Sequence, residues 1–201
     1  MTLGMRRPGL WLTPFAKYWQ KCGRSGYLSR VTPLPELSEP WMRSIIPGID
    51  PVIGHLLRAS EHILEDFERA IAPLTAEQIW ATPHGMTSVG FHAKHLAGST
   101  DRLSTYLEGR QLSAEQLAAL KAESTGDETA EQLIAAVRAA LGRYEVLVRT
   151  LTPEHFGDIR EIGRRRLQTT AISLAIHIAE HGQRHVGQTI SAAKLVLHGT
   201  L

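Results

Sequence analysis

The chain has 201 residues, of which 43% are hydrophobic and 21% charged, as expected for a globular protein with a substantial core. Its single cysteine, Cys22, excludes an internal disulfide framework and a cysteine-rich zinc site. No apolar run approaches the roughly 20 residues that a membrane span needs. We therefore expect a cytoplasmic protein without a membrane partner.

Charge divides the chain into two unequal parts. Residues 1–35 contain six of the 22 basic residues and no acidic residue. Removing these six leaves 16 basic residues against 20 acidic ones, a net charge of −4, which gives no indication of a nucleic-acid partner. Several prolines also interrupt the start. We predict that residues 1–38 form an irregular, poorly ordered basic extension that adds little to the core, and that residues 39–201 form one folded domain. An organelle-targeting peptide is an alternative interpretation of the extension.

Capping residues and apolar periodicity predict the first two long helices. Asp50 followed by Pro51 is a typical helix start, and it predicts a helix over 51–72. The Thr75 to Gln78 segment has the form of a capping box and predicts a short turn or helix. A second long helix is expected over 87–107, starting near Thr87 or Ser88.

Two further long helices are expected over 127–151 and 167–197, with a short helix within the polar connection at 113–123. The charged segment 157–166 is predicted to be a connection between helices. Within it, Arg164 to Arg166 are predicted to form a solvated turn or, alternatively, to contact an anionic substrate. Four long helices without a sheet predict an all-α fold, a four-helix bundle.

The last helix carries an unusual stripe of histidines. Steps of three and four residues align, in chain order, Leu174, His177, His181, His185, Gln188, Ala192 and Leu195. Buried imidazoles need partners, and a metal ion supplies one. His181 and His185 lie one turn apart and can bind the same ion, whereas His177 is two turns from His185, so two of the three suit one ion better than all three.

The second long helix carries His92 and His95, and periodicity does not choose between them. One of these together with His181 and His185 would make a three-nitrogen site with an open position, as in catalytic zinc sites. The alternative without metal is that each histidine lies at the edge of the core and bonds a backbone carbonyl.

The absence of glutamates at the expected positions beside the histidines disfavours two well-known classes of metal enzyme. Gly-Gln-Arg between His181 and His185 lacks the glutamate of the zincin motif, so a metalloprotease is disfavoured. The paired Glu-x-x-His motifs of di-iron bundles are also missing. Ligation by imidazole alone suits zinc, nickel, copper or iron.

Two histidine-bearing segments resemble one known family. They are SVGFHAKHLAGSTDRL and, far downstream, HIAEHGQRHVGQ, and together they look like the DinB family of metal-binding four-helix bundles; the lead-in EPWMRSIIPGIDPVIGHLL is also similar. The resemblance covers residues 39–197. It implies that His95, His181 and His185 are the metal ligands and that His92 and His177 support them.

The resemblance also implies a divalent metal ion, zinc or nickel, and frequent homodimers. Similar bundles include transferases that use low-molecular-weight thiols such as bacillithiol, mycothiol or glutathione. The implied function is therefore a metal-dependent enzyme acting on a small-molecule substrate, with a metal-bound thiolate or water as nucleophile. Asp101, Tyr106 and Glu180 are candidate proton carriers. The alternative is a non-catalytic, stress-associated metal-binding bundle with a vestigial site.

Overall fold

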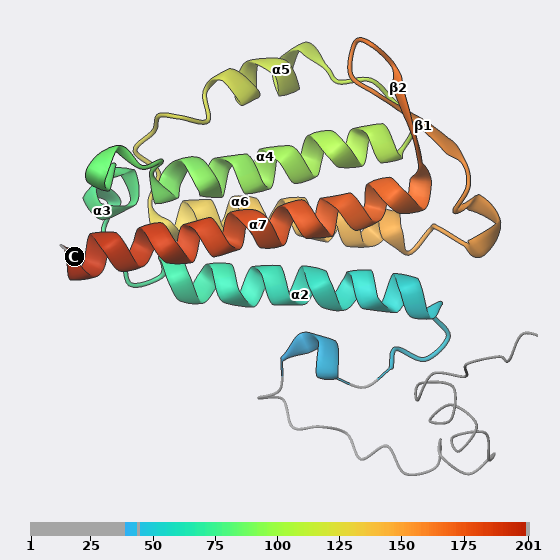
Figure 1. Ribbon diagram of the computed structural model, residues 1–201, viewed down its shortest axis with the longest axis horizontal. Helices are drawn as coiled ribbons and strands as arrows, with labels where there is room; N and C mark the ends of the chain where they lie inside the picture. The colour runs from blue at the N-terminus through green and yellow to red at the C-terminus, as the bar shows by residue number, and fades with distance from the viewer. Residues whose placement is uncertain (1–38, 44, 200–201) are drawn as a thin grey trace, which may run out of the picture.

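The computed structural model describes residues 39–43 and 45–199, and within them four long helices form a bundle (Figure 1). They are α2 (Pro51–Ile71), α4 (Val89–Leu107), α6 (Ala130–Val148) and α7 (Ala171–His198). The predicted four-helix bundle is confirmed, with the third helix shorter at both ends than expected. The predictions for residues 1–38 lie outside the described residues.

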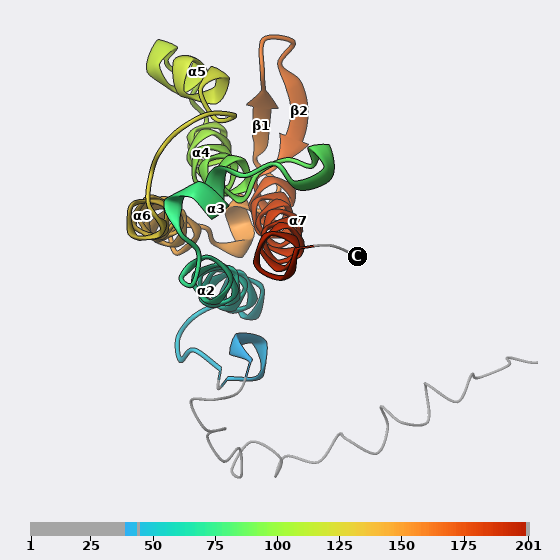
Figure 2. The ribbon, with the colours of Figure 1, turned by 90° about the vertical axis from the view of Figure 1, so that its left-hand side faces the viewer.

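The four helices are arranged in the cyclic order α2, α6, α4, α7, as the end-on view in Figure 2 shows. Helices α4 and α6 run in the same direction, because the segment between them returns along the outside of α4 and carries α5 (Ala114–Lys121) (Figure 1). Helix α7 runs antiparallel to α4. None of the described helices combines the length and the apolar character needed to cross a membrane.

Helices α2, α3 and α4 begin at the capping residues that the sequence indicated. The Asp50 carboxylate accepts hydrogen bonds from the backbone N–H groups of Val52 and Ile53, and Pro51 occupies the first turn of α2. Thr75 and Gln78 form the predicted capping box of α3 (Ala76–Trp80). Helix α4 is capped by Ser88. The 3-10 turn η3 (Pro83–Gly85) lies between α3 and α4.

The expectation of no sheet was wrong. The 3-10 turn η4 (Pro153–His155) leads into an antiparallel hairpin of β1 (Ile159–Ile162) and β2 (Leu167–Thr170), so α7 starts at Ala171 and not at residue 167. The hairpin is tied to the end of α4, because the Arg160 side chain donates to the Leu107 carbonyl. Arg164, Arg165 and Arg166 lie in its exposed turn, where Arg166 pairs with Glu161.

The core consists of two apolar clusters, one toward each end of the bundle. Phe67, Leu96 and Val186 belong to one, and Leu57, Tyr144 and Ile178 to the other. On three of the helices the change from one cluster to the other occurs at buried small or polar residues, namely Ser60 on α2, Ser99 and Thr100 on α4, and Gly182 and His185 on α7. The bundle therefore has a polar middle layer.

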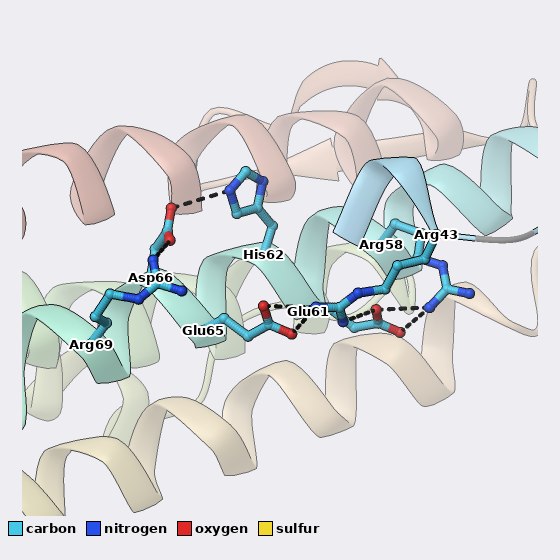
Figure 3. Close-up of polar contacts among 7 residues, drawn as sticks. All are labelled: Arg43, Arg58, Glu61, His62, Glu65, Asp66 and Arg69. Atoms are coloured by element: carbon cyan, nitrogen blue, oxygen red, sulfur yellow. Dashed lines mark hydrogen bonds and ion pairs between the residues drawn. The ribbon is translucent and has the colours of Figure 1, made fainter. Parts of the chain in front are cut away.

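The outer face of α2 carries a network of charges (Figure 3). The 3-10 turn η2 (Pro40–Met42) packs against α2, and Arg43 directly after it pairs with Glu61 and Glu65. Further along the same helix, Asp66 contacts both His62 and Arg69. These side chains are partly or fully exposed.

Candidate metal centre

The polar middle layer brings together three histidines from α4 and α7. His95, His181 and His185 each offer a ring nitrogen, and these three atoms lie within 4.8 Å of one another. Helices α4 and α7 pack against each other in antiparallel orientation (Figure 1), and the ring of His95 on α4 lies 5.2 Å from that of His181 and 4.5 Å from that of His185 on α7. It is the only such cluster of metal-ligating side chains among the described residues.

The spacing of the ring nitrogens suits a tetrahedral ion. Nε2 of His95 lies 3.1 Å from Nε2 of His181. The ligand nitrogens of a tetrahedral ion with metal–nitrogen bonds of roughly 2.0–2.1 Å lie about 3.3–3.4 Å apart. The ring of His185 lies 4.5 Å from that of His95 and 4.6 Å from that of His181, measured between centroids. The His95–His181 pair thus has nearly the spacing that such an ion requires, and the ring of His185 lies beside both.

Glu123 orients His95. Its carboxylate contacts Nδ1 of His95 at 2.7 Å and accepts a hydrogen bond from Nη1 of Arg102, also at 2.7 Å. A hydrogen bond from Nδ1–H to the carboxylate leaves Nε2 of His95 free of a proton and turned toward His181, which is the arrangement that supports metal-binding imidazoles. Burial opposes ionisation of Glu123, but the bonds from His95 and Arg102 outweigh it and hold the pKa of this carboxyl below its usual value.

Sequence reasoning missed Glu123. The residue follows α5 in the long crossover between α4 and α6, a segment that reads as a polar connection. Its side chain is nevertheless only 5% exposed. Gly98 makes room for it, since a Cβ at that position would lie 2.6 Å from the Glu123 carboxylate. Nothing in the spacing of residues along the chain indicates this contact, because His95 and Glu123 are 28 residues apart.

Two further histidines of these helices, His92 and His177, were predicted to support the ligands and lie outside the cluster. His92 is buried, and its Nδ1 lies 3.2 Å from Nδ1 of His185, so it is placed to orient that ring through the nitrogen remote from Nε2. His177 is exposed, with its ring 5.7 Å from that of His181. The predicted inward stripe was therefore wrong at His177 and also at Gln188, which is exposed.

Burial keeps His181 and His185 neutral. Desolvation, followed by the charge of His95, lowers the pKa of His181 and of His185 to about 4 in each case. Arg184 contributes to both shifts. A metal ion binds only neutral imidazole, so these two side chains present lone pairs at neutral pH without having to lose protons.

The candidate proton carriers are held elsewhere. Asp101 pairs with Arg143 and accepts a hydrogen bond from Gln116. Tyr106 is buried in the second apolar cluster, and Glu180 lines the groove between α2 and α7. Among the described residues, no hydrogen bond, ion pair or ring contact joins any of these three to the histidine cluster.

A cleft adjoins the cluster on one side. It has a volume of about 470 Å³ and lies between the η3–α4 connection and the middle of α7. His92 forms part of its wall, which connects the cleft to the neighbouring ring of His185. His95, His181 and His185 do not line the cleft themselves, and His92 stands between the cleft and His185. Within the cluster itself, the side chain of His95 is 21% exposed.

Comparison with known proteins agrees with this architecture. A conserved protein from Enterococcus faecalis aligns with a TM-score of 0.60 at 15% identity, covering 71% of this chain and 95% of that one. YfiT from Bacillus subtilis, described as "a probable metal-dependent hydrolase with an unusual four-helix bundle topology", aligns with a TM-score of 0.54 at 20% identity, covering 78% of this chain and 94% of that one. At these identities the likeness is one of fold.

Comparison of the sequence with known families identifies the family of this chain. Among curated proteins, no sequence matches this one significantly. The sequence profile of the DinB superfamily, however, matches residues 59–189, which include α4, the crossover from α4 to α6, and the part of α7 that carries His181 and His185. With this match over well more than half of its length, and with the helical bundle and histidine cluster described above, the chain belongs to the DinB superfamily.

Proposed function

We propose that the protein is a divalent-metal-dependent enzyme that acts on a small molecule, with His95, His181 and His185 as the metal ligands. The observation that carries the proposal is the convergence of these three ring nitrogens in a layer where Glu123 already orients one of the imidazoles. A divalent ion held by three protein ligands keeps a position for a water molecule or a thiol and lowers the pKa of that group.

Each surrounding residue then has a defined part. Glu123 holds the proton on Nδ1 of His95, and Arg102 keeps Glu123 ionised. His92 lies against Nδ1 of His185 and so leaves its Nε2 for the ion. The adjoining cleft, with its volume of about 470 Å³, is of the size that admits a small molecule and supports an enzyme over a vestigial metal site.

Finer features of the function are predictions that go with this proposal. The ion is zinc or nickel, and the reaction is either hydrolysis or transfer of a low-molecular-weight thiol. The similarity to YfiT, described as a probable metal-dependent hydrolase, supports the hydrolytic version. A homodimer, a cytoplasmic location and the division into an extension over 1–38 and a domain over 39–201 belong to the same set of predictions.

The test is to measure bound metal in protein purified without an affinity tag, for the wild type and for five single His→Ala variants at positions 92, 95, 177, 181 and 185. We expect one ion per chain in the wild type and its loss in the variants at 95, 181 and 185. The variant at 92 should bind more weakly, by about 10–100-fold, and the variant at 177 little less than the wild type. Full occupancy in His95→Ala together with loss in His92→Ala would show that the ligand set is wrong.

Cobalt-substituted protein distinguishes a metal-dependent enzyme from a non-catalytic protein with a vestigial metal site. An open coordination position predicts that mercaptoethanol changes the visible absorption of the Co²⁺-loaded wild type. An unchanged spectrum at saturating thiol would favour a non-catalytic metal-binding protein.

A further inference from the structure

The cleft beside the histidine cluster carries a single full charge. Its lining comes from the η3–α4 connection, α4 and α7 and includes, besides glycines, Met86, Thr87, His92, Arg184, Gln188 and Ser191. No acidic side chain is among them. The guanidinium of Arg184 is thus the dominant electrostatic feature of this space.

Arg184 has no counter-ion within the described part of the protein. Arg184 is exposed and, like exposed Arg149, Arg164 and Arg165, its side chain forms no ion pair or hydrogen bond with any described residue. Of these four arginines only Arg184 lines the cleft. Its charge is nevertheless felt at the metal-ligating rings, since it helps to lower the pKa of both His181 and His185. An anion in the cleft would compensate this charge.

A second donor lies beside the guanidinium. Gln188 is one turn further along α7, so its amide shares a face of the helix with Arg184, and the amide is not engaged by any described residue. The planar guanidinium matches a carboxylate, and a neighbouring amide N–H adds a further hydrogen bond. One guanidinium with otherwise neutral lining suits a group with a single negative charge better than a phosphate.

We propose that the cleft binds the carboxylate of a small-molecule substrate through Arg184 and Gln188 and so positions the reactive group of that substrate at the histidine cluster. The position of His92 supports this, because it lies in the wall of the cleft and within 3.2 Å of His185. The inference rests on the proposed function, since it names the substrate class of the same site.

The experiment compares two small thiols of similar size on Co²⁺-loaded protein, followed by visible absorption. Mercaptoacetate carries a carboxylate, and mercaptoethanol carries a hydroxyl in its place. We expect the wild type to bind mercaptoacetate about tenfold or more tightly than mercaptoethanol, because a hydrogen bond to a charged group is stronger than one to a neutral group. Arg184→Gln should reduce this ratio to near one, and Arg184→Lys should restore part of it.

Arg165→Gln is the matched control. It removes the same charge from the exposed hairpin turn and should keep the full preference of the wild type. A preference that persists in Arg184→Gln would overturn the proposal, since the carboxylate would then bind the ion itself or another residue. No preference in the wild type would overturn it as well.

A second measurement separates failure of this inference from failure of the proposed metal site. Acetate is titrated into metal-free protein at constant ionic strength, and backbone amide NMR signals are followed. Saturable shifts at Gly187 and Gln188 that disappear in Arg184→Gln support the carboxylate site even if no cobalt binds. Absence of these shifts, together with absence of a thiol preference, refutes it while leaving the metal ligands to the His→Ala series.

Discussion

Two sets of residues in this protein have the same chemistry and different settings. On the outer face of α2, Asp66 contacts His62 at 3.2 Å and Arg69 at 2.8 Å (Figure 3). In the polar middle layer, Glu123 contacts His95 and Arg102, each at 2.7 Å. Each set joins one histidine, one carboxylate and one arginine.

The settings differ in burial and in what the histidine faces. The side chain of Asp66 is 23% exposed and that of Arg69 is 74% exposed, against 5% for Glu123 and 9% for Arg102. His95 directs its second ring nitrogen at His181, whereas His62 has no second imidazole beside it among the described residues. The same three residue types therefore do not by themselves form a cluster that could hold a metal ion. The set in the middle layer differs because it is buried and because a second imidazole, that of His181, lies beside His95.

The largest expected difference between the two sets is in stability. Glu123→Ala leaves the guanidinium of Arg102 buried without its counter-ion, and we expect a loss of about 3 kcal/mol in the free energy of unfolding. Asp66→Ala removes an exposed pair and should cost within about 1 kcal/mol. Urea unfolding of both metal-free variants measures this. Equal losses would show that burial does not separate the two sets.

The second largest expected difference between the Glu123 set and the Asp66 set is their effect on metal affinity. Glu123→Gln keeps the shape of the side chain but weakens the bond that orients His95, so we expect metal affinity to fall about 10–100-fold. Asp66→Asn makes the matching change on α2 and should leave the affinity unchanged. Competition with a chelator of known affinity gives both values. An unaffected Glu123→Gln variant would remove this carboxylate from the metal centre.

The pH dependence of the metal-free protein should reveal the buried rings. His181 and His185 stay neutral in the folded state down to about pH 4, whereas in the unfolded chain they take up protons near pH 6.5. Between these values the unfolded state binds more protons, so stability falls as the pH is lowered from about 6.5 to about 4. Histidines with an ordinary pKa would release the metal as the pH falls through about 6.5. Because the pKa values of His181 and His185 are lower, metal occupancy should persist somewhat below this pH.

Urea unfolding of the metal-free wild type across this pH range checks the effect. A double variant, His181→Gln with His185→Gln, should show a shallower dependence on pH. If the free energy of unfolding of the double variant depends on pH as steeply as that of the wild type, then His181 and His185 do not control the pH dependence.

The smallest effect concerns two glycines. Gly54 on α2 has open space where a Cβ would lie, so Gly54→Ala should stabilise the helix by about 0.5–1 kcal/mol. A Cβ added to Gly98 on α4 would lie 2.6 Å from the carboxylate of Glu123 and 2.7 Å from the guanidinium of Arg102, too close for either. Gly98→Ala should lose that gain and weaken metal binding slightly. Thermal unfolding of the two variants compares them directly.

Signals within a few residues of each other predicted much of the fold. The Asp50–Pro51 start of α2 and the capping box at Thr75 act between neighbours, so sequence inspection finds them. The hairpin was missed because the charges of residues 157–166 suggested a solvated connection. Ile159 and Ile162 on one side of the turn, and Leu167 with two threonines on the other, are the strand-forming residues that indicated it.

The histidines show where helical periodicity misleads. Successive steps of four residues advance by about 40° around a helix with 3.6 residues per turn, so two steps from His185 to His177 amount to about 80°. That rotation moves His177 from the core to solvent. Spacing placed His181 and His185 together correctly, whereas the choice of His95 over His92 came from resemblance, and Glu123 depended on a crossover whose path no local pattern encodes.

The polar middle layer also has a consequence for how the molecule opens. Since the apolar packing changes at Ser60, at Ser99 and at Gly182, the two halves of the core form separate apolar clusters. Amide hydrogen exchange in the metal-free protein should therefore fall into two groups of protection, one for each half. An ion held between α4 and α7 at this level would merge the two into a single cooperative unit, so that metal binding and folding would depend on the same few atoms.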